Sequence, residues 1–273
     1  MKPQALILQA HGTNRDYDVA EALTLAGADP HPVPLNDLRA GKKHFVDYQM
    51  LVVAGGFSYA DSLGAGKLLA LDLNSYFNEE ISAFVQSGKP VIGICNGFQA
   101  LVKSGILPGE SPSPSKSPKG VLREGVRGEG ATLTFNAEGH FECRWVNLAP
   151  VSQTCIWTKD LEDTIFCPIA HGEGNFQTSE LFPLSSFVAD DQIALTYIHA
   201  DGTPANGDYP INPNGSILDI AGICNPQGNV LGLMPHPENH IHPHQHPQWT
   251  RGVKGNSGLV LFENGVKYAN QIS

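Results

Sequence analysis

The first half of the chain alternates short apolar runs with stretches in which apolar residues recur at helical spacing. The apolar runs predict buried strands at residues 5–14 and 50–56, each ending in a turn, and a third strand that ends at 91–92. Helical spacing predicts helices over residues 17–27 and 63–86. The prolines of 31–35 favour a short edge strand. This rhythm is typical of βαβ units, so we expect a parallel α/β sheet with a ligand site at the carboxyl ends of its strands.

The second half has a different pattern. Short strand-like segments follow one another at residues 131–136, 140–148, 164–172, 193–199 and 216–224, which predicts a β-rich addition to the sheet. Residues 228–238 predict a further buried strand that ends in a proline-stiffened turn, and 258–272 predict a terminal helix. The Ser/Pro-rich stretch 108–120 predicts a flexible insertion. No linker separates two apolar cores, so we expect a single domain over residues 1–273.

Composition and charge argue against several classes of function. A net charge of −10 argues against binding to nucleic acid, because phosphate contacts need clustered lysine and arginine. No apolar stretch approaches the roughly 20 residues that span a bilayer. The N-terminal apolar run is too short for a signal peptide, so we expect a cytoplasmic protein without a membrane partner. Five cysteines without a C-x-x-C pair indicate reduced thiols rather than a disulfide framework or a zinc site.

One of these cysteines has an unusual setting. Cys95 lies between the apolar run at 91–92 and a helical pattern, with Gly93 and Gly97 two residues to either side. Small flanking residues are what a tight, strained strand-to-helix turn requires, and such a turn exposes a nucleophile. The N-terminus of a helix also favours the thiolate, which is the reactive form of cysteine. Cys95 is therefore the candidate nucleophile.

A cysteine nucleophile needs a base, and the segment MPHPE supplies one. Prolines at 235 and 237 push the residues before them toward extended backbone, so His236 and Glu238 should point to the same side at the end of a strand. His236 would then move the proton while Glu238 holds the tautomer of its imidazole. On its own this pair is weak evidence. Because Cys95 and the pair both lie at the carboxyl ends of predicted strands, the three residues together are a candidate triad.

Backbone N–H groups should stabilise the oxyanion of such a reaction. The N–H of Asn96, directly after the nucleophile, is the first candidate donor. Gly55 and Gly56, at the end of another predicted strand, are the second, because bare backbone approaches a ligand most easily. These two glycines could equally serve only to form a turn.

Several segments together resemble the class I glutamine amidotransferases. They are GGFSYADSLGAGK (55–67), GICNGFQAL (93–101), NPNGS (212–216) and DIAGICNPQGNVLGLMPHPE (219–238). Within that family the chain is similar to the glutaminase subunits of the synthases that aminate formylglycinamide ribonucleotide in purine synthesis. The resemblance covers nearly the whole chain and implies a flavodoxin-like, three-layer α/β fold with a mostly parallel sheet.

The resemblance also implies roles for the candidate residues. Cys95 would attack the side-chain amide of L-glutamine, and His236 would protonate the departing ammonia and then activate water against the glutamyl thioester. Glu238 would orient His236.

Further ligands and partners follow from the same resemblance. Gln99 and the backbone around Gly172 and Glu173 would hold the glutamine. The ammonia would pass to a large synthase subunit, and ATP and Mg²⁺ would act there, because this chain has no G-x-x-x-x-G-K-[ST] loop. A small bridging subunit is a further candidate partner. No cofactor and no metal are expected on this chain.

Two alternatives remain open. A peptidase or chaperone-like relative could use the same cysteine turn, although such relatives resemble this chain less around MPHPE and NPNGS. The run HPENHIHPHQHPQW carries five histidines and could instead mark a metal-binding protein, since imidazoles bind zinc and nickel. Its prolines favour an exposed loop that chelates metal only adventitiously.

Overall fold

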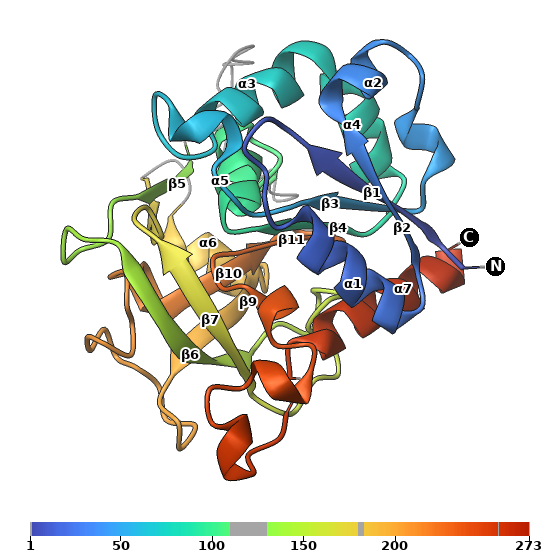
Figure 1. Cartoon of the computed structure of the whole chain (residues 1–273). Coiled ribbons are helices and arrows are strands. Elements are labelled where there is room, and N and C mark those ends of the chain that lie inside the picture. The colour runs from blue at the N-terminus through green and yellow to red at the C-terminus, as the bar shows by residue number, and fades with distance from the viewer. Residues whose placement is uncertain (1, 110–129, 180–182, 256, 273) are drawn as a thin grey trace.

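A computed structural model describes residues 2–109, 130–179, 183–255 and 257–272. These residues form a nine-stranded sheet, and its parallel part lies between two groups of helices, which gives three layers there (Figure 1). One face is covered by α1 (Asp16–Ala26) and α7 (Leu259–Ile272). The other is covered by α2 (Leu35–Arg39), α3 (Lys67–Tyr76), α4 (Asn78–Gln86) and α5 (Asn96–Lys103). The predicted insertion at 108–120 lies, from residue 110 onward, outside the described residues.

The sheet has a parallel half and an antiparallel half. In spatial order, the parallel strands are β2 (Asp29–Pro34), β1 (Gln4–Gln9), β3 (Met50–Val53), β4 (Val91–Ile94) and β11 (Val230–Leu233). The antiparallel strands continue as β10 (Ile220–Cys224), β9 (Ile193–Ile198), β6 (Glu142–Pro150) and β7 (Ile165–His171). The α/β class with a β-rich addition is therefore confirmed, and the edge position of β2 explains its prolines.

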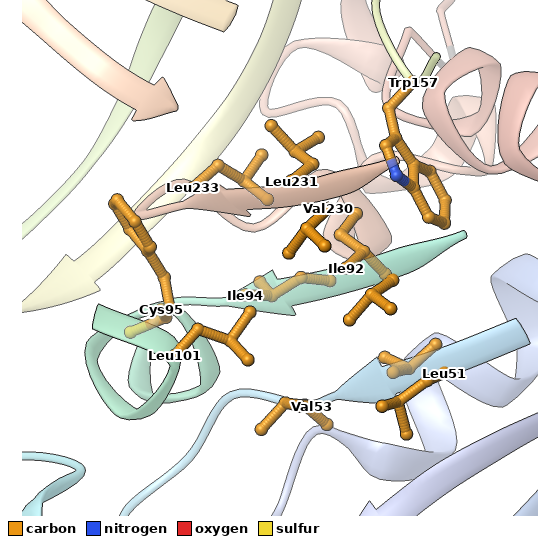
Figure 2. Packing of buried hydrophobic residues seen from close by; sticks show 14 of the residues in the cluster. Leu51, Val53, Ile92, Ile94, Cys95, Leu101, Trp157, Val230, Leu231 and Leu233 are labelled. Atoms are coloured by element: carbon orange, nitrogen blue, oxygen red, sulfur yellow. The ribbon is translucent and has the colours of Figure 1, made fainter. Parts of the chain in front are cut away.

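The central strands are buried on both faces. Figure 2 shows the side chains of β4 between those of β3 and those of β11, with Cys95 at the end of β4. Every residue of these three strands is buried. Parallel strands covered by helices need continuous apolar runs rather than alternating ones, and this is the pattern seen in the sequence.

The antiparallel strands are covered differently. Along β7, buried residues alternate with half-buried ones, so that Cys167, Ile169 and His171 lie on one buried face. A separate two-stranded sheet pairs β5 (Ala131–Thr134) with β8 (Asn175–Thr178). Neither β8 nor the short helix α6 (Leu184–Ala189) was predicted, because each is too short to show a clear period. No helix in the described ranges is long and apolar enough to cross a membrane.

The single helix predicted over residues 63–86 is wrong. Helix α3 begins only after Gly66, and the chain breaks at Phe77 (φ −129°) before α4 begins. Phe77 is buried, and its ring lies 5.6 Å from that of Phe45. The helical period continues through the break, but packing of Phe77 into the core turns the chain between α3 and α4.

Candidate active site

Cys95 occupies the predicted turn between β4 and α5. Its backbone is strained, with φ 50° and ψ −107°. Such a conformation costs a non-glycine residue about 1–3 kcal/mol and persists only where the surroundings enforce it. The flanking glycines let the neighbouring backbone pack closely against the turn, and this packing holds Cys95 in its strained conformation. A Cβ on Gly97 would lie 1.8 Å from the carbonyl oxygen of Val53, so α5 packs directly on the backbone of β3.

The sulfur of Cys95 lies at the start of α5, whose first N–H groups have no acceptor within the helix. These N–H groups and the helix dipole favour a negative charge at that position. The residue is 6% exposed, and Sγ lies 3.8 Å from the carbonyl oxygen of Ala170 on β7. The end of β7 therefore runs beside the nucleophile.

His236 and Glu238 meet directly after β11. Nδ1 of His236 lies 2.6 Å from Oε1 of Glu238, and both side chains are buried. The backbone N–H of His236 donates to the carbonyl oxygen of Pro168 on β7 (2.8 Å). The predicted contact exists, but the extended backbone expected for it is wrong. Residues Pro237–Asn239 form a 3-10 turn, because proline suits the first position of a helical turn.

Gly55 shows how closely the candidate groups approach one another. A Cβ on Gly55 would lie 2.9 Å from Cε1 of His236 and 3.5 Å from Cβ of Cys95. The structure therefore brings Gly55, Cys95 and His236 together at the carboxyl ends of β3, β4 and β11. Their catalytic roles remain predictions.

The charge state of His236 follows from its surroundings. Burial alone lowers the pKa of His236, but the Glu238 carboxylate and the Cys95 sulfur raise it to about 10. These interactions favour the imidazolium form of His236 beside the sulfur. This arrangement supplies a proton donor for a leaving group and a counter-charge for a thiolate.

This raised pKa predicts how stability depends on pH. Because folded His236 binds its proton more tightly than the unfolded chain, its contribution is complete below about pH 6.5 and is lost as the pH rises toward 10. Glu238→Gln removes the main interaction that raises this pKa. We therefore expect the difference in unfolding free energy between wild type and Glu238→Gln to be largest at pH 6 and to shrink toward pH 10.

Urea denaturation at pH 6, 8 and 10 would measure this difference. Glu263→Gln on the exposed side of α7 is the matched control, for which no such trend is expected. A Glu238→Gln difference that stays constant over the whole pH range would contradict the assignment.

The predicted oxyanion-hole residues occupy different positions around this centre. Asn96 is the first residue of α5, so its N–H is one of the free donors of that helix. Gly56, with φ 134°, lies against the loop after β1, where a Cβ would come within 2.7 Å of the Asn14 nitrogen. Phe57 also binds this loop, through an N–H bond to the Gly12 carbonyl oxygen (3.1 Å). Donation to an oxyanion by these groups remains a prediction.

The side chain of Asn96 has a role that the sequence did not indicate. Its Oδ1 accepts bonds from the N–H (3.3 Å) and the hydroxyl (2.5 Å) of Ser58. Its Nδ2 donates to Asp61 (2.9 Å). Tyr59, Ala60 and Asp61 all have φ between 52° and 55°, so the segment after Gly56 is strained as well. Asn96 ties this strained segment to the nucleophile turn.

The predicted glutamine ligands also lie together, although Gln99 is already bonded to the protein. Its Nε2 donates to the carbonyl oxygen of Glu173 (2.6 Å), and its Oε1 accepts from Asn96 (3.2 Å). The Glu173 carboxylate lies 3.5 Å from Nζ of Lys103. Gln99 therefore holds the segment of Gly172 and Glu173 against α5, and contact with glutamine remains a prediction.

The histidine-rich run forms two separate ring pairs, His240 with His246 (5.5 Å between centroids) and His242 with His244 (5.1 Å). His240 is buried, and its Nδ1 contacts the carbonyl oxygen of Phe166. Nε2 of His242 lies 2.8 Å from Oε1 of Glu21 on α1. Over the described ranges, no three His, Cys, Asp or Glu side chains are arranged to hold a metal ion. The geometry of this run therefore gives the metal-binding alternative no support.

Comparison with known proteins adds an independent line of support. Residues 2–269 match the CobB/CobQ-like glutamine amidotransferase domain family. The chain is 54% identical to the phosphoribosylformylglycinamidine synthase subunit PurQ of Treponema denticola, over 98% of this chain and 99% of that one. It is 42% identical to PurQ of Dehalococcoides mccartyi, over 99% of both. A chain of the Thermotoga maritima PurLQS structure superimposes with a TM-score of 0.72 and 30% identity, over 98% of this chain and 99% of that one.

Proposed function

Because this chain belongs to the CobB/CobQ-like glutamine amidotransferase family, we propose that it is the glutaminase subunit of a phosphoribosylformylglycinamidine synthase. It hydrolyses L-glutamine and supplies ammonia for purine biosynthesis. The observation that carries the site assignment is the buried His236–Glu238 pair beside a strained cysteine turn. The similarity to PurQ over nearly the full length supports the choice of synthase.

The reaction follows from the positions of the three side chains. The Cys95 thiolate attacks the amide carbon of glutamine, and the carbonyl oxygen becomes an oxyanion that N–H groups at Gly55, Gly56 and Asn96 would stabilise. His236 gives its proton to the amide nitrogen, the C–N bond breaks, and ammonia leaves a glutamyl thioester on the sulfur. His236 then takes a proton from water, which attacks the thioester and releases glutamate and the Cys95 thiolate.

A partner is needed for this ammonia to be useful. Ammonia released into neutral water is protonated and is then a poor nucleophile, so a receiving surface must lie close to the site. The Thermotoga maritima relative comes from a structure named PurLQS, which supports a complex with a synthase subunit. We propose that a large synthase subunit binds ATP and Mg²⁺ and receives the ammonia, with a small bridging subunit as a further member.

Mixing the purified chain with its synthase subunit tests this function. We expect glutamine hydrolysis to rise when the synthase is added, and formylglycinamide ribonucleotide to be aminated with glutamine as nitrogen donor. Bovine serum albumin in place of the synthase is the control for a nonspecific effect. If glutamine supports no amination in the mixture while ammonium does, the proposed function is wrong.

A further inference from the structure

His171 lies at the end of β7 in an unusual state for a histidine. It is 3% exposed and follows Ala170, whose carbonyl oxygen lies 3.8 Å from the Cys95 sulfur. The same strand holds the backbone of His236 through Pro168. His171 therefore belongs to the strand end that runs beside the proposed nucleophile and base, yet the mechanism above gives it no role.

The proton of His171 can be assigned from its neighbour Asn136. Nδ2 of Asn136 donates to the carbonyl oxygens of His140 (3.0 Å) and His171 (2.8 Å), so its Oδ1 faces the other way as an acceptor. That oxygen accepts from the N–H of Gly174 (3.0 Å) and lies 3.1 Å from Nδ1 of His171. Nδ1 must therefore carry the proton. Burial and the neighbouring His236 lower the pKa of His171 to about 3, so the ring is neutral and Nε2 is a bare acceptor.

This acceptor has no partner. In the described part of the chain, no group forms a hydrogen bond with Nε2 of His171, although the atom is buried. A buried acceptor without a partner destabilises the fold, so its presence calls for an explanation. The ring cannot easily turn away, because a Cβ on Gly174 would lie 2.3 Å from its Cε1, which shows how tightly the ring packs on that backbone.

The end of β7 that carries His171 borders the candidate triad. Cys167 and His171 are four residues apart on the buried face of this strand, so their side chains point the same way. The carbonyl oxygen of Pro168, the residue after Cys167, accepts from the backbone N–H of His236 (2.8 Å), and the carbonyl oxygen of Ala170, the residue before His171, lies 3.8 Å from Sγ of Cys95. Burial and the charge of His236 lower the pKa of His171, which agrees with this placement. The unpartnered acceptor therefore lies on the strand end that borders both the proposed nucleophile and the proposed base.

We propose that Nε2 of His171 accepts a hydrogen bond from the side-chain –NH₂ group of glutamine and selects amide over ester or acid leaving groups. This inference rests on the proposed glutaminase function. An amide nitrogen brings N–H donors to the site, whereas a γ-ester has none and the carboxylate of the product glutamate would place an oxygen lone pair against that of Nε2. A neutral acceptor also leaves the departing ammonia unprotonated. His171 is thus a specificity-determining residue.

Two substitutions distinguish the role of Nδ1 of His171 from the role of Nε2. His171→Asn keeps an N–H donor near Nδ1 for Asn136 and removes the acceptor at Nε2. His171→Gln keeps an acceptor near Nε2 and removes the donor to Asn136. Each variant, in complex with the synthase, would be assayed with L-glutamine and with the γ-methyl ester of L-glutamate, which carries the same acyl group. Circular dichroism spectra would establish that both variants are folded.

We expect His171→Asn to lower kcat/KM for glutamine about 10- to 100-fold and that for the ester less than about threefold. His171→Gln should retain the wild-type preference for amide over ester. Equal losses on both substrates in His171→Asn would overturn the inference, since a structural role or a role in thioester hydrolysis affects both. A wild-type complex that does not hydrolyse glutamine would overturn the proposed function and this inference with it.

Discussion

Cys95→Ser is expected to abolish glutamine-dependent amination by the complex, with a loss of about 10³-fold or more. The reason is chemical, because a serine hydroxyl is a much weaker nucleophile than a cysteine thiolate. The thioester then never forms. The synthase partner should still turn over with ammonium as nitrogen donor, because its own site does not depend on this sulfur.

The measurement is amination of formylglycinamide ribonucleotide, with glutamine and then with ammonium as the nitrogen source. Cys143→Ser is the matched control, because Cys143 lies exposed on β6 and should be replaceable without loss. If Cys95→Ser retains glutamine-dependent turnover, Cys95 is not the nucleophile. Loss of the ammonium-dependent reaction would instead indicate a disrupted complex.

Gly97→Ala is expected to destabilise the protein by more than about 3 kcal/mol. Helix propensity alone gives the opposite sign, since alanine in a helix is favoured over glycine by about 1 kcal/mol. The new Cβ would lie 1.8 Å from the carbonyl oxygen of Val53 and 3.2 Å from its Cβ. The backbone of β3 cannot move away without shifting the centre of the sheet. The steric clash therefore outweighs the gain in helix propensity, and the substitution is destabilising. Glutaminase activity should fall as well, because α5 carries the nucleophile turn.

Urea denaturation would give the unfolding free energy of this variant. Gly172→Ala is the stability control, because its Cβ would meet only Phe141, at 3.8 Å. We expect that control to change stability by less than about 0.5 kcal/mol. A Gly97→Ala protein as stable as wild type would show that α5 and β3 can separate freely, contrary to the close packing described above.

Much of the site could be predicted because its strongest signals are local. The glycines at 93 and 97 on either side of Cys95 predict a tight turn whatever surrounds it, since only glycine allows the backbones to approach so closely. The apolar runs before Cys95 and before His236 identified two buried strands, and parallel strands place their carboxyl ends at one edge. These two facts place Cys95 and His236 at one edge of the sheet, and the pairing of β4 with β11 in the structure makes them neighbours.

Other features depend on partners that are distant in the chain. Asn136 and His171 are 35 residues apart, and Asn96 and Ser58 are 38 residues apart, so no local period could pair them. The extended backbone predicted for the His236–Glu238 contact is wrong for a related reason. Two prolines allow both an extended segment and a turn, and contacts with β7 at Pro168 accompany the turn that forms.

The sequence by itself determined most of the longer elements of this protein and its candidate reactive groups, because the spacing of apolar residues and the placement of glycine act over a few residues. Only the tertiary structure decided where the helix breaks at Phe77, how Asn96 holds the strained segment, and that Nε2 of His171 is buried without a partner among the described residues. These features depend on strand order and burial, which set distances and the cost of charge between residues that no local pattern connects.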